Sequence, residues 1–159
     1  MSYSNSIIFG PIPSRRFGIS LGIDLSPTKK QCNFDCLYCE LEGAKTVEKM
    51  DEFPSVEDII KEIQNSFSNH PKIDVLTLTC NGEPTLYPKL NELIDEINKI
   101  KGNTKTLILS NGSTIYKEDI FNTLLKIDIV KLSLDCVSEK CFKKLDRVNN
   151  SVETQKIVP

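Results

Sequence analysis

The sequence contains no tryptophan, one histidine (His70) and no apolar run that approaches the ~20 residues needed to span a bilayer. Its first ten residues lack a basic segment followed by a long apolar core, so we expect no secretion signal. The formal net charge is −2, with lysines and acids interspersed, which provides no overall basic surface for nucleic acid. These absences predict a cytoplasmic protein that does not enter a membrane.

The chain has 159 residues, enough for one ordinary domain that buries roughly 70% of its unfolded surface. Its composition, 39% hydrophobic and 26% charged, is typical of a globular protein. We therefore expect residues 1–159 to form a single domain.

Three of the six cysteines, Cys32, Cys36 and Cys39, lie within eight residues. This spacing lets one short loop direct three sulfurs at a common centre, and soft thiolate ligands suit zinc or an iron–sulfur cluster. Both usually take four protein ligands, yet no fourth cysteine or histidine follows at a usual spacing. In a secreted protein six cysteines would indicate disulfides, whereas in a cytoplasmic protein the clustered three indicate a metal site with one open position.

Strand and helix patterns alternate along the rest of the chain. Period-two and β-branched runs predict four strands, at 17–25, 73–79, 106–110 and 129–134. Apolar residues at helical spacing predict helices at 56–68, 90–100 and 120–125, and a short fourth helix after Ser138. Residues 1–16, with their glycine and prolines, are interpreted as an irregular lead-in.

This alternation predicts an α/β fold with a parallel sheet and right-handed crossovers. In such folds ligands bind beyond the carboxyl ends of the strands. Polar candidates follow each predicted strand: the cysteine loop, then Asn81, Gly82 and Glu83, then Ser110 and Asn111, and finally Ser133 and Asp135. We expect these side chains to share one rim.

Two motifs together resemble the radical S-adenosylmethionine (SAM) enzymes. One is the cysteine triad with Tyr38 just before Cys39, and the other is the turn Cys80-Asn-Gly-Glu-Pro-Thr85, which is similar to the family's Gly-Gly-Glu-Pro turn. The lead-in over 10–27 resembles the branch related to wyosine-base (tRNA-modifying) synthetases. The resemblance covers nearly the whole chain and implies a radical-SAM-type incomplete TIM barrel, of which about four of six βα units are present.

The resemblance implies that Cys32, Cys36 and Cys39 bind three irons of a [4Fe–4S] cluster, and that the open iron binds SAM. The reduced cluster would pass one electron to the sulfonium, and the resulting 5′-deoxyadenosyl radical would take a hydrogen atom from an unknown substrate. No side chain is assigned as catalytic. The implied SAM contacts are Tyr38 near the adenine, Asn81, Gly82 and Glu83 at the methionine amino group, and Ser110, Asn111, Ser133 and Asp135 at the carboxylate or ribose.

Two departures from the family pattern shape what we expect of partners. With about four of six units, the domain is expected to be C-terminally incomplete, as a truncated product, a fragment, or one of two chains that complete the barrel together. No cysteine before Cys32 can hold the second cluster of the archaeal wyosine synthetases, which weakens tRNA as the substrate. A flavodoxin or a ferredoxin is the expected electron donor.

Several alternatives remain open from the sequence. The triad could bind structural zinc with a distant ligand, in a non-catalytic module, or the chain could be an inactive remnant. Glu83 could merely cap the following helix. Cys80, Cys136 and Cys141 could bind a second cluster, although Cys141 is better placed to fill the core. The pair Arg15 and Arg16 could bind an anionic substrate group or be solvated surface.

Overall fold

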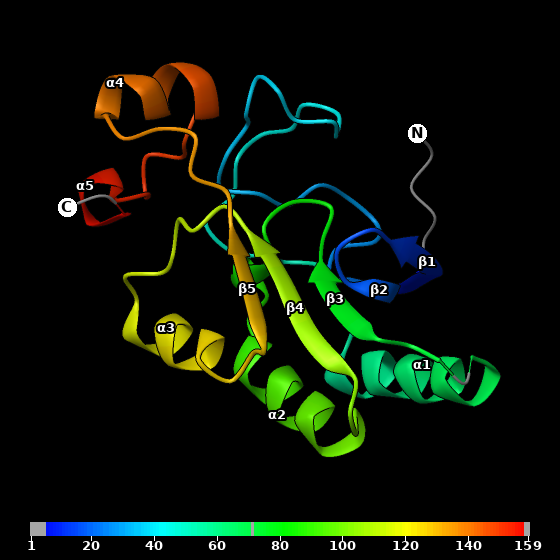
Figure 1. Ribbon diagram of the computed structural model, residues 1–159. Coiled ribbons are helices and arrows are strands. Elements are labelled where there is room, and N and C mark those ends of the chain that lie inside the picture. The colour runs from blue at the N-terminus through cyan, green and yellow to red at the C-terminus, as the bar shows by residue number, and fades with distance from the viewer. Residues whose placement is uncertain (1–5, 71, 158–159) are drawn as a thin grey trace.

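The computed structural model of the protein describes residues 6–70 and 72–157, and a five-stranded sheet runs through it (Figure 1). The strands stand in chain order: β1 (Ile8–Ser14), β2 (Gly18–Asp24), β3 (Val75–Thr79), β4 (Lys105–Ser110) and β5 (Ile129–Leu132). β1 is antiparallel to β2, and all the later pairs are parallel. The predicted parallel βα arrangement is therefore confirmed.

Three helices cover one face of this sheet, as Figure 1 shows: α1 (Val56–Asn69), α2 (Leu90–Ile100) and α3 (Glu118–Leu124). Ser55 caps the start of α1, because its hydroxyl accepts a hydrogen bond from the Asp58 amide at 3.1 Å. α2 ends just before Gly102, whose φ of 55° suits a residue without a Cβ. None of the helices in 6–70 and 72–157 is long and apolar enough to cross a bilayer.

The main core lies between the sheet and these helices. Its fully buried residues include Leu21, Ile23, Leu76 and Leu78 from the strands, and Ile59, Ile63, Leu93, Ile94 and Ile97 from the helices. Each such side chain contributes about 1.5–3 kcal/mol by leaving water. Successive side chains of a strand point to opposite faces of the sheet. The residues between those that enter the core therefore lie on the opposite, helix-free face.

The interpretation of residues 1–16 as irregular is wrong for residues 8–14, and residues 1–5 lie outside the described part of the chain. Ile8–Ser14 forms β1, which pairs with β2 through a register shift between Phe9 and Ile12. An edge strand tolerates prolines because its outer amides need no partner, so Pro11 and Pro13 did not preclude a strand. At the other edge, β5 ends at Leu132, two residues earlier than predicted.

A second, smaller apolar cluster lies beside the cysteine loop. It includes Phe34 and Phe142, whose ring centroids are 6.3 Å apart in an edge-to-face arrangement. α4 (Glu139–Cys141) continues into a π-helical turn, η2 (Phe142–Asp146), and α5 (Thr154–Ile157) follows. Cys141 does not simply fill the core as a free thiol, since it forms a disulfide with Cys136.

Candidate functional site

The cysteine loop follows β2 and lies at the carboxyl ends of the parallel strands (Figure 1). Gln31 forms a bridge with Gly82 in the turn after β3: its amide donates to the Asn81 carbonyl at 2.8 Å, and its carbonyl accepts from the Glu83 amide at 3.0 Å. At Gly82, φ is 142° and an added Cβ would lie 1.9 Å from the Gln31 carbonyl oxygen. Glycine is therefore required for the two motifs to join.

The buried Gln31 side chain holds both flanks of the cysteine loop. Its amide nitrogen donates to the Ser26 hydroxyl at 2.7 Å and to the Glu52 carbonyl at 2.6 Å, and its oxygen accepts from the Asp51 amide at 2.9 Å. Sequence reasoning missed Gln31, although its position directly before Cys32 was a signal that it could orient the loop.

The Glu83 side chain accepts four hydrogen bonds and is 1% exposed. Its Oε1 accepts from the Thr85 amide, the Thr85 hydroxyl and the Ser110 hydroxyl at 3.0, 2.6 and 2.7 Å, while Oε2 accepts from the Asn111 amide at 2.7 Å. Burial raises the pKa of this carboxyl. Glu83 thus caps the short helix η1 (Pro84–Leu86), the role that the sequence left open as an alternative. Its hydrogen bonds with Ser110 and Asn111 also join the turn after β3 to the end of β4.

Asn111 connects the end of β4 to the cysteine loop. Its side-chain nitrogen lies 3.0 Å from Asn33 Oδ1 and 3.7 Å from Cys32 Sγ. Asn33 in turn donates to the Ser113 hydroxyl at 2.7 Å. The residues after strands β2, β3 and β4 therefore meet at one rim, as predicted.

Tyr38 is held by two carboxylates. Its hydroxyl lies 2.6 Å from Asp135 Oδ2 and 3.0 Å from Asp146 Oδ1. Burial, followed by the Asp135 hydrogen bond, raises the pKa of Tyr38 well above its ordinary value. Asp146, a buried residue of η2, was not predicted, and only the fold brings it near the loop.

The cysteines of the triad are free thiols. Burial raises the pKa of Cys32 to about 12 and that of Cys36 to about 11, so both are protonated at neutral pH without a metal. Metal binding must displace these protons. Among the residues that the structure describes, no three His, Cys, Asp or Glu side chains gather closely enough to hold a single metal ion.

Two buried groups at this rim fit a cluster and an amino-acid ligand. Both polar atoms of the Asn81 side chain are buried without a hydrogen-bond partner among the described residues, which costs about 1–3 kcal/mol for each unmet group. An amide donor and acceptor suits a ligand that carries both an ammonium and a carboxylate. Lys30 Nζ is likewise buried without a hydrogen bond, 3.6 Å from Asp35 Oδ1, and its charge suits a centre ligated by thiolates.

The remaining predicted residues take different positions. Ser110 supports Glu83 rather than lining open space. Ser133 is exposed, and its backbone amide donates to the Ser110 carbonyl at 2.9 Å. Asp135 is exposed and is engaged by Tyr38. Cys80 is buried in the main core, and the Cys136–Cys141 disulfide removes the other two cysteines from the set of free thiolate ligands.

Comparisons with known proteins identify the family and the fold of the chain. The family model for the Radical SAM superfamily matches residues 27–158. A UPF0026 protein of Helicobacter pylori is 55% identical over 142 residues, which are 89% of this chain and 46% of that protein. A UPF0026 protein of Methanocaldococcus jannaschii is 38% identical over 157 residues, which are 96% of this chain and 48% of that protein. The chain therefore spans about half the length of these relatives.

The solved structure of TYW1 with a lysine-pyruvate adduct bound has a related fold. The TM-score is 0.59 at 19% identity, over 87% of this chain and 49% of that chain. This likeness supports the predicted architecture of parallel βα units from an incomplete TIM barrel. Since the family model covers most of the sequence, including the cysteine triad and the turn around Glu83, this chain belongs to the radical SAM superfamily.

Proposed function

We propose that this chain is a radical SAM enzyme, or the N-terminal part of one, which holds a [4Fe–4S] cluster on Cys32, Cys36 and Cys39 and binds SAM beside it. One observation carries the proposal: the loop with three free thiols is joined by backbone hydrogen bonds to a turn in which the side-chain amide of Asn81 is buried without a partner among the described residues. When bound, the reduced cluster and SAM would supply a 5′-deoxyadenosyl radical for hydrogen abstraction.

The side chains of the chain have separate roles in this proposal. Asn81 contacts the amino-acid part of SAM through its free amide. Glu83 acts through its hydrogen bonds as a positioning residue, because all four donors that it accepts come from the protein. Asn111 fixes Cys32 relative to that turn. Tyr38, exposed over half of its surface, remains available to an adenine ring.

The proposed setting follows from the chemistry of the free thiols. Thiols that must ligate a reducible cluster have to stay reduced, so we place the protein in the cytoplasm, with a flavodoxin or a ferredoxin as electron donor. The Cys136–Cys141 disulfide is the one described feature that counts against a reducing compartment. The substrate stays open, with tRNA as one candidate. A partner chain or a further segment could complete the barrel.

Anaerobic reconstitution tests the proposal. The chain, supplied with iron and sulfide, should become brown, and its visible spectrum should change when SAM is added. Cys36→Ala should lose the colour, whereas Cys80→Ala, which removes a buried core thiol outside the triad, should keep it. A colourless zinc adduct, or full cluster assembly in Cys36→Ala, would contradict the ligand assignment.

A second readout separates an enzyme from an inactive remnant. With dithionite and SAM, the reconstituted chain should release 5′-deoxyadenosine. A chain that assembles the cluster and yet releases none would be a cluster-binding module without turnover.

A further inference from the structure

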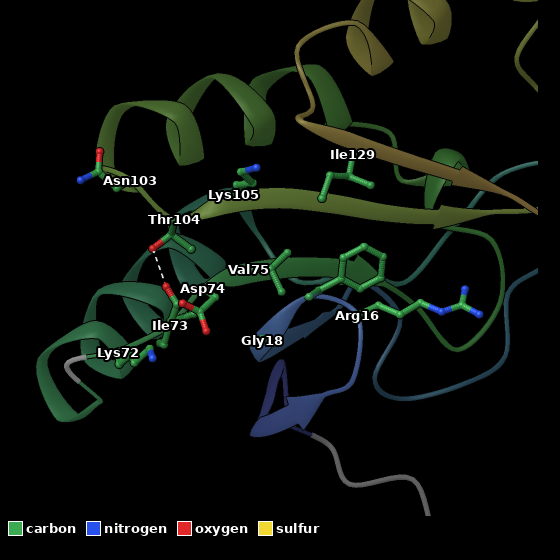
Figure 2. Close-up of a pocket in the computed structure, with 11 residues that line it drawn as sticks. Arg16, Gly18, Lys72, Ile73, Asp74, Val75, Asn103, Thr104, Lys105 and Ile129 are labelled. Carbon is green, nitrogen blue, oxygen red and sulfur yellow. Dashed lines mark hydrogen bonds between the residues drawn. The ribbon is translucent and has the colours of Figure 1, made fainter.

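A hollow lies at the amino-terminal ends of the parallel strands, on the edge of the sheet opposite the cysteine loop (Figure 2). Its volume is about 860 Å³, and it is lined by the turn between β1 and β2 and by the segments that lead into β3, β4 and β5. A second hollow of about 480 Å³ shares Arg16 and Phe17 with it and continues over the helix-free face. We name the two together the basic trough.

The trough collects unpaired positive charge. Arg16, Lys72 and Lys105 line its first part, and Arg15 and Lys131 line the second. None of these five side chains forms an ion pair with the acids that the structure describes, although the molecule has ten other such contacts. In a chain of net charge −2, this is a local excess of cations.

The one acid in the trough serves the fold. Asp74 Oδ2 accepts a hydrogen bond from the Ile19 amide at 2.7 Å, and it lies against Gly18, where an added Cβ would be 2.3 Å away. Asp74 therefore holds the turn between β1 and β2 at the start of β3. In Figure 2, Arg16 and Lys72 lie on opposite sides of the pocket, so no single acid neutralises both.

We infer that the basic trough binds a small phosphate-bearing molecule, a site that does not depend on the proposed cluster. Arginine and lysine side chains from separate segments suit the several oxygens of a phosphate or diphosphate. Phe17, Leu109 and Ile129, which are at least partly exposed, provide apolar surface for an uncharged part of the ligand. The volumes fall in the ~300–1,000 Å³ range of small-molecule sites, which favours a compact ligand over an RNA strand.

Calorimetric titration of the full chain with inorganic pyrophosphate, and separately with ATP, tests this inference. Both should bind, and added chloride should weaken the binding because the contacts are ionic. Arg16→Gln and Lys105→Gln should each weaken pyrophosphate at least tenfold. The matched controls are Lys99→Gln and Lys143→Gln, two lysines outside the trough that pair with acids on their own helical turns, and they should change the affinity less than twofold.

Three outcomes would overturn the inference: no pyrophosphate or ATP binding, equal weakening by the control variants, or tight binding of a short RNA without binding of pyrophosphate. Circular dichroism and the urea midpoint should show that each variant is folded. Iron content after reconstitution is measured in parallel. For the wild-type chain, absence of anion binding with full iron content would sink this inference alone, whereas absence of iron with anion binding present would sink only the proposed function.

Discussion

Glu83 and Asn81 occupy neighbouring positions in one turn but differ in how their polar atoms are satisfied. Glu83 accepts four hydrogen bonds from the protein, whereas the side-chain amide of Asn81 has no partner among the described residues. A satisfied buried group stabilises the site, and an unsatisfied one is costly until a ligand arrives. At the scale of single residues, Glu83 therefore stabilises the turn, and the Asn81 side chain is left to bind a ligand.

Glu83→Gln should lower the stability of the metal-free chain. One of the two carboxylate oxygens becomes an NH₂ group, which must then face a donor such as the Asn111 amide or the Ser110 hydroxyl. We expect a loss of about 1–3 kcal/mol in the free energy of unfolding, measured by urea denaturation. Glu62→Gln, at an exposed position of α1, should change it by less than about 0.5 kcal/mol. Equal effects of the two changes would show that the Glu83 network contributes nothing.

At the scale of elements, the bridge between Gln31 and Gly82 joins the cysteine loop to the turn after β3. Gly82→Ala should destabilise the chain by about 3 kcal/mol, because the Cβ would meet the Gln31 backbone and φ is unfavourable. Gly102→Ala is the matched control. Its φ is also positive, but no atom lies within 4 Å of the added Cβ, so we expect about 1 kcal/mol. Similar urea midpoints for both variants would contradict the bridge.

A carboxylate also joins β4, β5 and the end of α2. Asp128 accepts hydrogen bonds from Lys101 Nζ and from the amide and hydroxyl of Thr106. Lys101, followed by the Thr106 amide, lowers the pKa of Asp128 to about 2. A lowered folded-state pKa stabilises the chain above the unfolded pKa, and this contribution is lost as the pH falls through the folded value.

Lys101→Met should therefore reduce the loss of stability between about pH 4 and pH 2, since it removes the largest cause of the shift. Lys99→Met, in the last turn of α2, should leave that loss unchanged because both members of its pair with Glu96 are solvent-exposed, where an ion pair contributes little. The measurement is the urea midpoint as a function of pH. Identical pH profiles for wild type and Lys101→Met would disprove the role of this pair.

Elements with strong periodicity could be predicted from the sequence, and contacts between distant segments could not. The pattern at 56–68 and the Ser55 cap gave α1 to within one residue. β1 was missed because Gly10, Pro11 and Pro13 indicate a turn unless the strand is known to lie at an edge.

For the candidate functional site, too, local motifs could be predicted from the sequence and contacts between distant segments could not. The motifs located the cysteine loop and the turn around Glu83 because they depend on local spacing. Asn33 and Asp146 act through contacts made only in the folded chain, and no local pattern marks them, whereas Gln31 was marked only by its position directly before Cys32. The Cys136–Cys141 disulfide is local by contrast: its cysteines are five residues apart, one before α4 and one at the end of α4.

At the scale of the whole molecule, β5 is an open edge. Within the described part of the chain it pairs with β4 alone, and apolar side chains on or near it are exposed: Leu109, Val130, Leu132 and Leu134. An exposed, apolar edge strand pairs readily with another chain. We expect this chain to self-associate as its concentration rises.

Val130→Lys should suppress that association, because an edge lysine opposes strand pairing. Phe121→Lys removes a similarly exposed apolar side chain from α3 and should leave the association intact. Sedimentation velocity from about 5 to about 200 µM would measure it. A monomeric wild type over this range, or equal effects of both variants, would contradict the edge-strand account.

The central claim concerns three thiols and an amino-acid ligand at one rim of the sheet. Mössbauer spectroscopy of the chain reconstituted anaerobically with enriched iron tests it most directly, because each iron of a [4Fe–4S] cluster reports its own ligands. We predict one iron distinct from the other three, whose signal alone shifts when SAM is added. Four equivalent irons that ignore SAM, or no cluster signal at all, would contradict the account.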